Sequence, residues 1–295
     1  MKHTAKEWMA ATRYWSFPVS SMPVVVTCAY LFWKGTPFNV LHAVLAVVGI
    51  VVLHAAGNVL SDYFDYKTGV DSVEAYAIPN LVHHQFEPKE YLVFSAVLFA
   101  VGCAIGMTLV LLTGWPLLVI GGAGVLLAVG YSWLKYRALG DVDIFLNFAV
   151  LPILGTSYVV AGSVLWEALV LALPIGLITV SVLHINNTTD IATDGAAGMR
   201  SLAMLLGERP SVKLYIAYQL LPFVLVVAAV IVGWLPWFAL LCLVAFAVAW
   251  RNITKARGYF STGRDAILGL DQMSAQLQLV FGLTFSLGLL VAALV

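Results

Sequence analysis

Two groups of polar side chains stand out because each one follows directly on a long apolar run. Their members share an oxygen-bearing side chain and a helical spacing: Asn58, Asp62, Asp65, Asn187, Asp190 and Asp194. The spacings i, i+4, i+7 and i, i+3, i+7 place each group on one face of a helix. Asn186 would serve as well as its neighbour in the second group.

The chemistry that these groups favour is the binding of a divalent cation. Carboxylates that face one another at membrane level repel strongly unless a cation lies between them. Ligand sets made only of oxygen suit hard cations, Mg²⁺ in particular, which keeps positions open for phosphate oxygens. Two such groups can hold a pyrophosphate between metal ions and turn it into a good leaving group. The neighbouring apolar helices would then hold a lipid tail.

A simpler interpretation is that these aspartates are solvated helix ends. Both groups, however, lie at the C-terminal ends of their apolar runs, where the helix macrodipole disfavours anions. Two groups at equivalent positions make a purely structural origin a poor explanation. The sequence therefore predicts a functional site made of both groups.

The elements that carry these groups are predicted to be transmembrane helices. Of the 295 residues, 62% are hydrophobic and only 10% are charged, whereas a soluble domain is about a quarter charged. A bilayer core needs about 20 apolar residues per helix, and such long runs exclude the strands of a barrel. We predict an all-α polytopic protein with nine spans: 16–33, 39–61, 91–112, 115–134, 142–163, 166–186, 212–232, 234–250 and 276–294.

The basic residues then fall almost entirely on one side of the membrane. In this arrangement 14 of the 15 Lys and Arg residues share the side of the N-terminus, and only Lys34 lies on the other side. The positive-inside rule makes the shared side cytoplasmic. We therefore expect the N-terminus and both aspartate groups to face the cytoplasm of a bacterial-type inner (plasma) membrane.

The two halves of the chain are predicted to form a parallel pseudo-repeat. Asp62 and Asp190 are four spans apart, so their helices run in the same direction and end on the same side. Spans 1–4 and 5–8 form the repeat, and a ninth helix follows. We expect residues 1–295 to make one transmembrane domain.

Four segments of the sequence resemble landmarks of the UbiA superfamily of intramembrane prenyltransferases. The segments are HAAGNVLSDYFDYKTGVD (54–71), YSWLKYRALGD (131–141), NTTDIATDGAAGMRSLAMLLG (187–207) and MSAQLQLVFGL (273–283). The HxxGN lead and the DYFD spacing resemble the naphthoate branch, which serves menaquinone biosynthesis, more than the 4-hydroxybenzoate branch. The resemblance covers nearly the whole chain.

The resemblance implies nine helices around a central cavity and Mg²⁺-dependent transfer of an isoprenyl chain. The donor would be an allylic isoprenyl pyrophosphate, and the aromatic acceptor would be 1,4-dihydroxy-2-naphthoate or a related quinone precursor. The implied metal ligands are Asp62, Asp65, Asp71, Asp190 and Asp194. All of these carboxylates except Asp71 are also implied to be catalytic, as is His54 in the hypothesis given below. The implied substrate-binding residues are Asn58, Asn187, Lys67, Tyr131, Lys135, Arg137 and Arg200. The partners are thus small molecules and membrane lipid, and no nucleic acid is expected.

The sequence departs from the family pattern at positions where positive charge is expected. Thr189 stands where an arginine is usual, and Met199 stands where a lysine is usual. The segment after the first motif offers His83 and His84 in place of Lys or Arg. Since each charged contact is worth about 1.5–3 kcal/mol, either these histidines contribute or the donor, acceptor or reaction differs from the standard one.

Two histidines lie at membrane level on the motif faces. His54 lies one turn before Asn58, and His184 lies three residues before Asn187. Each is interpreted first as a hydrogen-bonded core histidine. The sharper hypothesis is that His54 is catalytic and deprotonates or polarises the hydroxyl of the acceptor.

Two other functions stay open at this point. The first is a cation-coupled transporter, which the parallel repeat would suit, although the aspartates lie at the cytoplasmic edge and not at the midplane. The second is a non-catalytic lipid- or quinone-binding relative, which the missing basic residues favour.

Overall fold

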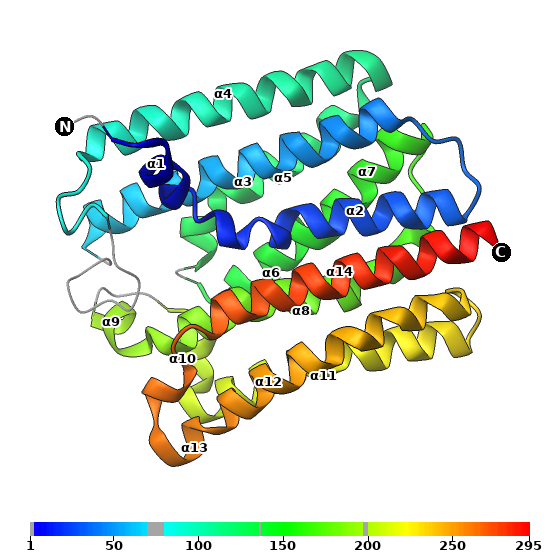
Figure 1. Cartoon of the computed structure of the whole chain (residues 1–295). Helices are drawn as coiled ribbons and strands as arrows, with labels where there is room; N and C mark the ends of the chain where they lie inside the picture. The colour runs from blue at the N-terminus through cyan, green and yellow to red at the C-terminus, as the bar shows by residue number, and fades with distance from the viewer. Residues whose placement is uncertain (1–2, 70–79, 136, 197–199) are drawn as a thin grey trace.

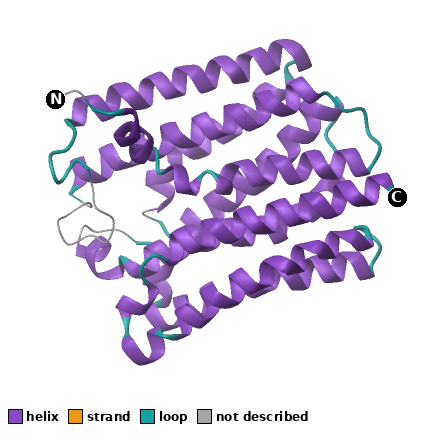
Figure 2. Cartoon of the chain, viewed as in Figure 1, coloured by secondary structure: helices purple, strands orange, loops and turns teal. Residues whose placement is uncertain are grey.

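The structure is a computed structural model that describes residues 3–69, 80–135, 137–196 and 200–295; for residues 132, 135, 194 and 196 it describes the backbone only (Figure 1). The described residues form helices joined by turns and loops (Figure 2). The helices are α1 (Ala5–Ala11), η1 (Tyr14–Ser16), α2 (Pro18–Trp33), α3 (Val40–Thr68), α4 (Pro88–Thr113), α5 (Pro116–Lys135), α6 (Gly140–Phe145), η2 (Leu146–Val150), α7 (Leu151–Ala161), η3 (Trp166–Leu171), α8 (Ala172–Thr189), α9 (Ile191–Ala196), α10 (Leu202–Leu206), α11 (Glu208–Ile231), η4 (Trp237–Ala245), α12 (Phe246–Arg257), α13 (Tyr259–Thr262), η5 (Arg264–Ile267) and α14 (Leu270–Leu294).

The predicted all-α polytopic class is confirmed. In the described part of the chain, eight helical segments are long and apolar enough to cross a membrane, and the apolar stretch Pro116–Tyr131 of α5 is shorter. The two ends of the chain lie at opposite ends of the bundle (Figure 1), as an odd number of crossings requires. The count of nine spans stays a prediction.

Three predicted spans are not α-helical throughout, and prolines explain why. The π-helical segment η2 contains Phe148, whose carbonyl would meet the ring of Pro152 four residues later. The 3₁₀ segment η3 contains Val170 and stands in the same relation to Pro174, and η4 begins directly after Pro236. Proline lacks an N–H and clashes with the carbonyl at i−4, so the preceding turn tightens or widens.

The last helix, α14, holds the two halves of the chain together. It packs against α2 on one side and against η4 and α8 on the other. Phe281 and Phe285 of α14 are fully buried in the main hydrophobic cluster, where Phe223 of α11 contacts Phe281 edge to face. Burial of aromatic rings at this junction fixes the N-terminal end of α14 close to both η1 and α8.

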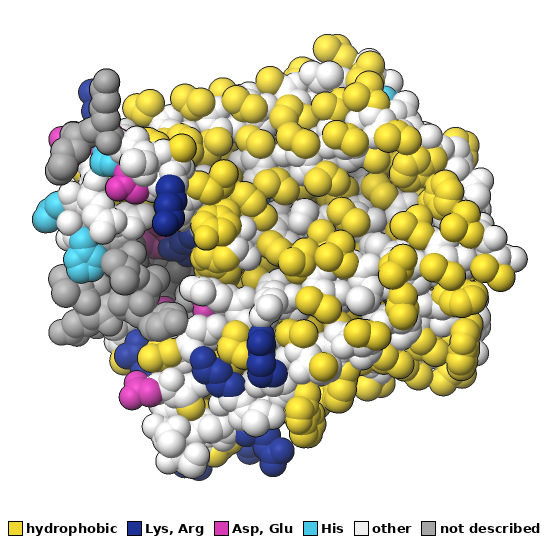
Figure 3. All heavy atoms as spheres, viewed as in Figure 1, with side chains coloured by type: hydrophobic (Ala, Val, Ile, Leu, Met, Phe, Trp, Pro, Cys, Tyr) yellow, Lys and Arg dark blue, Asp and Glu magenta, His cyan; other side chains and the backbone are white. Residues whose placement is uncertain are grey.

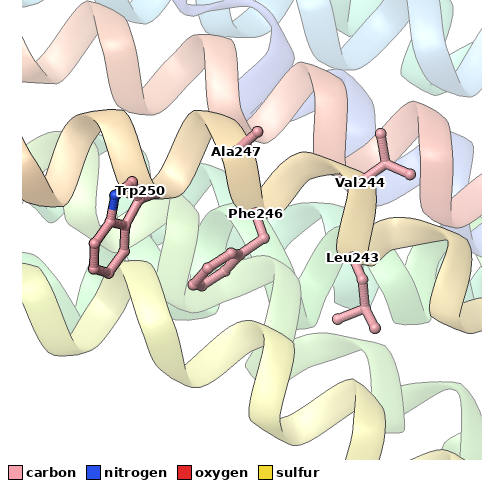
Figure 4. A pocket seen from close by; sticks show the side chains of 5 residues that line it. All are labelled: Leu243, Val244, Phe246, Ala247 and Trp250. Carbon is pink, nitrogen blue, oxygen red and sulfur yellow. The ribbon is translucent and has the colours of Figure 1, made fainter.

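The charged side chains gather at one end of the bundle, and apolar side chains cover the rest of the visible face (Figure 3). Helices α1, α9 and α13 also lie at that end (Figure 1). A groove of about 460 Å³ lies elsewhere, on η4 and α12, and is lined by Leu243, Val244, Phe246, Ala247 and Trp250 (Figure 4). Its lining contains no residue of α3 or α8, so it is not the predicted central cavity, which stays a prediction.

Candidate functional site

The first aspartate motif lies on one uninterrupted helix, as expected. α3 continues past the apolar run to Thr68 and ends at Gly69, which takes the left-handed conformation at φ 74°. Asn58, Asp62 and Asp65 therefore share one face of its last turns. The Asp65 carboxylate accepts a hydrogen bond from the Ser61 hydroxyl at 3.2 Å.

The segment before the first span packs over this motif. The guanidinium of Arg13 forms an ion pair with Asp62, and Arg13 itself has a positive φ of 52°. The Asn58 amide donates to the Thr12 carbonyl at 2.9 Å and to the Ser16 hydroxyl at 3.1 Å. The positive φ of Arg13 is uncommon for a residue other than glycine and costs free energy. The ion pair of Arg13 with Asp62 offsets this cost.

The hydrogen bonds around His54 define which ring nitrogen is protonated. The Ser20 hydroxyl donates its proton to the Phe17 carbonyl. Its oxygen can therefore accept a hydrogen bond from Nδ1 of His54 at 2.9 Å. Ser16 likewise donates to the Arg13 carbonyl, and its oxygen lies 3.4 Å from Nε2. The shorter contact with Ser20 favours the tautomer that is protonated at Nδ1 and carries the lone pair on Nε2. Phe148 of η2 packs edge-on against the ring, with the centroids 5.0 Å apart.

The second motif is not on one continuous helix, which corrects the expectation from its spacing. α8 ends at Thr189, Asp190 is its C-terminal cap with φ −101° and ψ 15°, and Asp194 belongs to α9. The hydroxyls of Thr188 and Thr189 donate back to the carbonyls of His184 and Ile185 at 2.7 and 2.9 Å. Such back-bonding bends and weakens a helix, so the helix breaks at Asp190.

Asp190 meets a basic residue from a distant segment. Nη2 of Arg264, in η5, lies 3.4 Å from Oδ1 of Asp190. Each motif therefore has its first aspartate paired with an arginine that sequence analysis assigned only to the positive side of the membrane. Asn187 is 1% exposed, and its Oδ1 has no hydrogen-bond partner among the described residues.

His184 has the structural environment expected of a core histidine. It is fully buried on α8, its Nδ1 lies 2.8 Å from Oδ2 of Asp141, and its Nε2–H donates to the Ser211 carbonyl at 3.2 Å. Asp141 lies in α6 and is the last residue of the sequence landmark 131–141, which includes the loop before this helix. The pair thus connects that loop to the helix of the second motif.

The remaining predicted residues are less closely gathered. Lys67 is exposed, with its ammonium 5.3 Å from the Tyr63 ring centroid, and Arg137 is exposed and stacks on Trp133 at 3.8 Å. Three further residues are exposed, namely Arg200, His83 and His84, whereas Tyr131 is half-buried near the end of α5. The predictions for Asp71 and Met199, and for the side chains of Lys135 and Asp194, lie outside the described residues.

The oxygen ligands at this end fit a hard divalent cation. Among the described residues, no group of three or more His, Cys, Asp or Glu side chains is already arranged around one point. The described donors are instead the carboxylates of Asp62, Asp65 and Asp190 and the unpartnered Oδ1 of Asn187. Such a set matches Mg²⁺ chemistry, and binding there requires that the two arginines leave the carboxylates or share them.

Sequence reasoning missed Arg13 and Arg264 as site residues. Arg13 precedes the first span, and Arg264 precedes the last. In the sequence both resemble ordinary charges beside a span, because no periodicity links them to their partners. Asp62 lies 49 residues from Arg13, and Asp190 lies 74 residues from Arg264. Ser16 and Ser20 carried a usable signal, because two hydroxyls one turn apart at the start of an apolar run mark a polar face.

The comparisons with known proteins identify the family. Residues 21–259 match the UbiA prenyltransferase family. The chain is 30% identical over 301 residues to UbiA prenyltransferase domain-containing protein 1 of Mus musculus, with 99% of this chain and 86% of the relative covered. For the Xenopus tropicalis protein of the same name the identity is 31% over 230 residues, with 76% and 66% covered. These alignments leave part of each relative's length unmatched.

Solved structures support the fold. The apo structure of a UbiA homolog from Aeropyrum pernix K1 matches with a TM-score of 0.69 at 18% identity, covering 90% of this chain and 96% of that one. A UbiA homolog from Archaeoglobus fulgidus bound to GPP and Mg²⁺ matches with a TM-score of 0.62 at 13% identity, covering 95% and 99%. The sequence matches and the shared fold together lead to one conclusion: this chain belongs to the UbiA prenyltransferase family.

Proposed function

We propose that this chain transfers an isoprenyl group from an allylic isoprenyl pyrophosphate to an aromatic acceptor in the membrane, and that residues 1–295 act as one transmembrane unit. The observation that carries the proposal is the position of Asp62 and Asp190 at the charged end of an apolar bundle, each paired with an arginine. A related fold that binds GPP and Mg²⁺ supports the donor class and the metal. The apolar spans would hold the isoprenyl tail.

The metal ligands proposed are Asp62, Asp65, Asp190 and Asn187, together with Asp71 and Asp194 from the sequence motifs. When bound there, Mg²⁺ neutralises the pyrophosphate oxygens and makes the group a better leaving group. Asn58 positions the end of α3 through its bonds to Thr12 and Ser16. Cations for the phosphate oxygens come from Lys67, Lys135, Arg137 and Arg200, with Tyr131 lining the site.

The reaction breaks the bond between the allylic carbon and the pyrophosphate oxygen, and the electron pair leaves with pyrophosphate. A ring carbon of the electron-rich acceptor then forms the new carbon–carbon bond with the allylic cation. In an acceptor such as 1,4-dihydroxy-2-naphthoate, that ring carbon loses its carboxylate as CO₂, which restores aromaticity. The naphthoate acceptor is our specific proposal, and it rests on the HxxGN lead and the DYFD spacing of the first motif.

We assign the acceptor's hydroxyl proton to Nε2 of His54. Ser20 holds the Nδ1–H, so the lone pair on Nε2 is available in the neutral ring. Ser16 lies beside Nε2 and also accepts from Asn58, which links this base to the metal-binding face of α3. Removal of the hydroxyl proton makes the acceptor ring more nucleophilic when the allylic cation forms.

The test is a transfer assay with purified protein in detergent. Isoprenyl pyrophosphates of several lengths are supplied with 1,4-dihydroxy-2-naphthoate or with 4-hydroxybenzoate, and prenylated product and pyrophosphate are both measured. We expect product only with the naphthoate and with Mg²⁺, and none after EDTA treatment or in the Asp62→Ala and Asp190→Ala variants. The matched control is Asp265→Ala, an exposed carboxylate at the same end of the bundle.

The possible outcomes separate the parts of the proposal. Product from 4-hydroxybenzoate alone would overturn the naphthoate assignment but keep the transferase. Pyrophosphate release without product would mean that the donor is right and both acceptors are wrong. A folded protein that binds donor but releases nothing would identify a binding-only relative.

A further inference from the structure

Arg264 approaches the second motif from a segment that is far away in sequence. Its Nη2 lies 3.4 Å from Oδ1 of Asp190, and the side chain of Asp190 is only 14% exposed. The arginine belongs to η5, a short turn between the helical hairpin α11–α12 and the last helix. The contact therefore joins the start of α14 to the end of α8.

Asp190 lies where a helix disfavours a negative charge. It caps the C-terminus of α8, where the unpaired carbonyls carry the negative end of the helix dipole. The hydroxyls of Thr188 and Thr189 donate to backbone carbonyls and not to this carboxylate. A cation is therefore favourable beside Asp190, and the guanidinium of Arg264 is one that the structure places there.

The guanidinium of Arg264 can donate more hydrogen bonds than the single one that it makes to Asp190. A single contact of 3.4 Å falls short of the paired, shorter bonds of a bidentate arginine–carboxylate interaction. Nε of Arg264 is buried and has no hydrogen-bond partner among the described residues. A buried donor without an acceptor is unfavourable, so this N–H is available to an acceptor, and an anion is the acceptor that suits a guanidinium best.

The position of Arg264 is fixed by its neighbours, so it is not a freely solvated charge. Ile267, three residues later, is 1% exposed and packs in a cluster with Ile185 of α8. The Lys255 ammonium donates to the Leu268 carbonyl at 2.6 Å and ties the segment to α12. Gly263 and Gly269 have φ of 77° and 78° and allow the sharp turns at either end.

The part of the second motif that lies on α8 contains no Lys or Arg, and the basic residue of this motif, Arg200, comes later in the chain. Thr189, at a position where a cation was expected, is 5% exposed and uses its hydroxyl on the Ile185 carbonyl. A pyrophosphate bound next to Asp190 would therefore lack a partner from α8. Arg264 can fill this role, because it already lies against the same carboxylate and its Nε has no acceptor in the described part of the chain.

We propose that Arg264 is a transferable counter-ion: it neutralises Asp190 in the metal-free protein and turns to the pyrophosphate oxygens once a divalent cation takes the carboxylate. The proposal rests on the proposed transferase function and names a residue that contacts its donor. It requires that Arg264 opposes metal binding and favours pyrophosphate binding. Substitution of a residue with a merely structural role would change the metal affinity and the pyrophosphate affinity in the same direction, or would change neither.

The experiment measures the two binding steps separately on the full chain. Mn²⁺, in place of Mg²⁺, is titrated by electron paramagnetic resonance without donor, and inorganic pyrophosphate is then titrated at saturating Mn²⁺. In Arg264→Gln we expect Mn²⁺ to bind about fivefold more tightly or better, and pyrophosphate to bind about 10-fold more weakly. Arg264→Lys keeps the charge and should recover part of the pyrophosphate affinity.

Arg257→Gln is the matched control, since it removes an exposed arginine of the adjacent helix α12. Unchanged affinities in Arg264→Gln, or a parallel loss of both, would overturn the proposal. Failure of the transferase proposal looks different, because the wild type would then bind Mn²⁺ and pyrophosphate but form no product with any acceptor. If the wild type forms product and the Mn²⁺ and pyrophosphate affinities of Arg264→Gln equal those of the wild type, the counter-ion proposal is rejected and the transferase proposal stands.

Discussion

His184 and Asp141 form a buried pair that joins α8 to the start of α6, with 2.8 Å between Nδ1 and Oδ2. The other ring nitrogen faces the Ser211 carbonyl, which can only accept. A proton therefore lies between the ring and the carboxylate, and the pair carries no net charge whichever group holds that proton. The second motif begins one turn later, so this pair determines where Asn187 and Asp190 lie.

Loss of one member of this pair should destabilise the protein strongly. Removing one partner of a buried ion pair costs about 3–5 kcal/mol, because the other is left unpaired. We expect His184→Ala and Asp141→Ala each to lower the thermal midpoint in detergent, and the double variant to be no worse than the more damaged single variant. The measurement is a double-mutant cycle. Additive losses would mean that the two side chains act separately.

The sequence was enough to predict the helices but not the contacts between them. Apolar runs of about 20 residues predicted the long apolar helices, since burial in lipid demands such runs, but several helices extend beyond the predicted ends, as α3 does to Thr68 and α12 does to Arg257. The break at Asp190 was missed, because the spacing of the motif assumes a continuous helix, whereas Thr188 and Thr189 bend it. The proline-linked segments η2 and η3 were missed for a similar local reason.

The sequence predicted the acidic residues of the candidate site, but it did not predict the two arginines that pair with them. The aspartates stood out because carboxylates are rare in an apolar chain. Arg13 and Arg264 did not stand out, because arginines beside cytoplasmic span ends are ordinary. Their pairing with Asp62 and Asp190 depends on how η1 packs against α14 and how η5 packs against α8 and α12, which no local pattern encodes.

The orientation of the chain gives a simple prediction. If the crossings are odd in number, the ends lie on opposite sides, as their positions at opposite ends of the bundle indicate (Figure 1). In a bacterial host we expect green fluorescent protein to fluoresce at the N-terminus and alkaline phosphatase to be active at the C-terminus. Phosphatase activity at the N-terminal end as well would require an even number of crossings and would reject the nine-span topology.

The proposed base can be tested by the pH dependence of turnover. Replacing His54 by Gln keeps a polar side chain but removes the basic Nε2, so kcat should fall by about 10²-fold or more and the limb of the pH profile that reports this base should flatten. His42→Gln is the matched control, because that histidine lies at the other end of α3 and donates to the Val159 carbonyl. If His54→Gln kept the wild-type profile, the histidine would be structural.

Ser20 should influence the same profile without being a base. Its oxygen accepts from Nδ1 and so keeps the lone pair on Nε2. We expect Ser20→Ala to lower kcat less than His54→Gln does and to leave the KM for the donor unchanged, because the tautomer is no longer fixed but the metal ligands are intact. Ser20→Thr, which retains the hydroxyl, should restore most of the rate. A raised donor KM in Ser20→Ala would instead indicate displacement of α2.

The contact of α14 with η4 should be the least tolerant point of the fold. A Cβ added at Gly288 would lie 2.1 Å from the Phe238 carbonyl oxygen, and this neighbour is backbone and cannot rotate away. Gly288→Ala must therefore push α14 off η4, at a cost of about 1–3 kcal/mol or more. Because η5, which carries Arg264, directly precedes α14, we expect a lower thermal midpoint together with weaker pyrophosphate binding. Gly121→Ala, in α5 with open space around it, should leave both unchanged, and an equal loss in the two variants would trace the effect to glycine replacement in general.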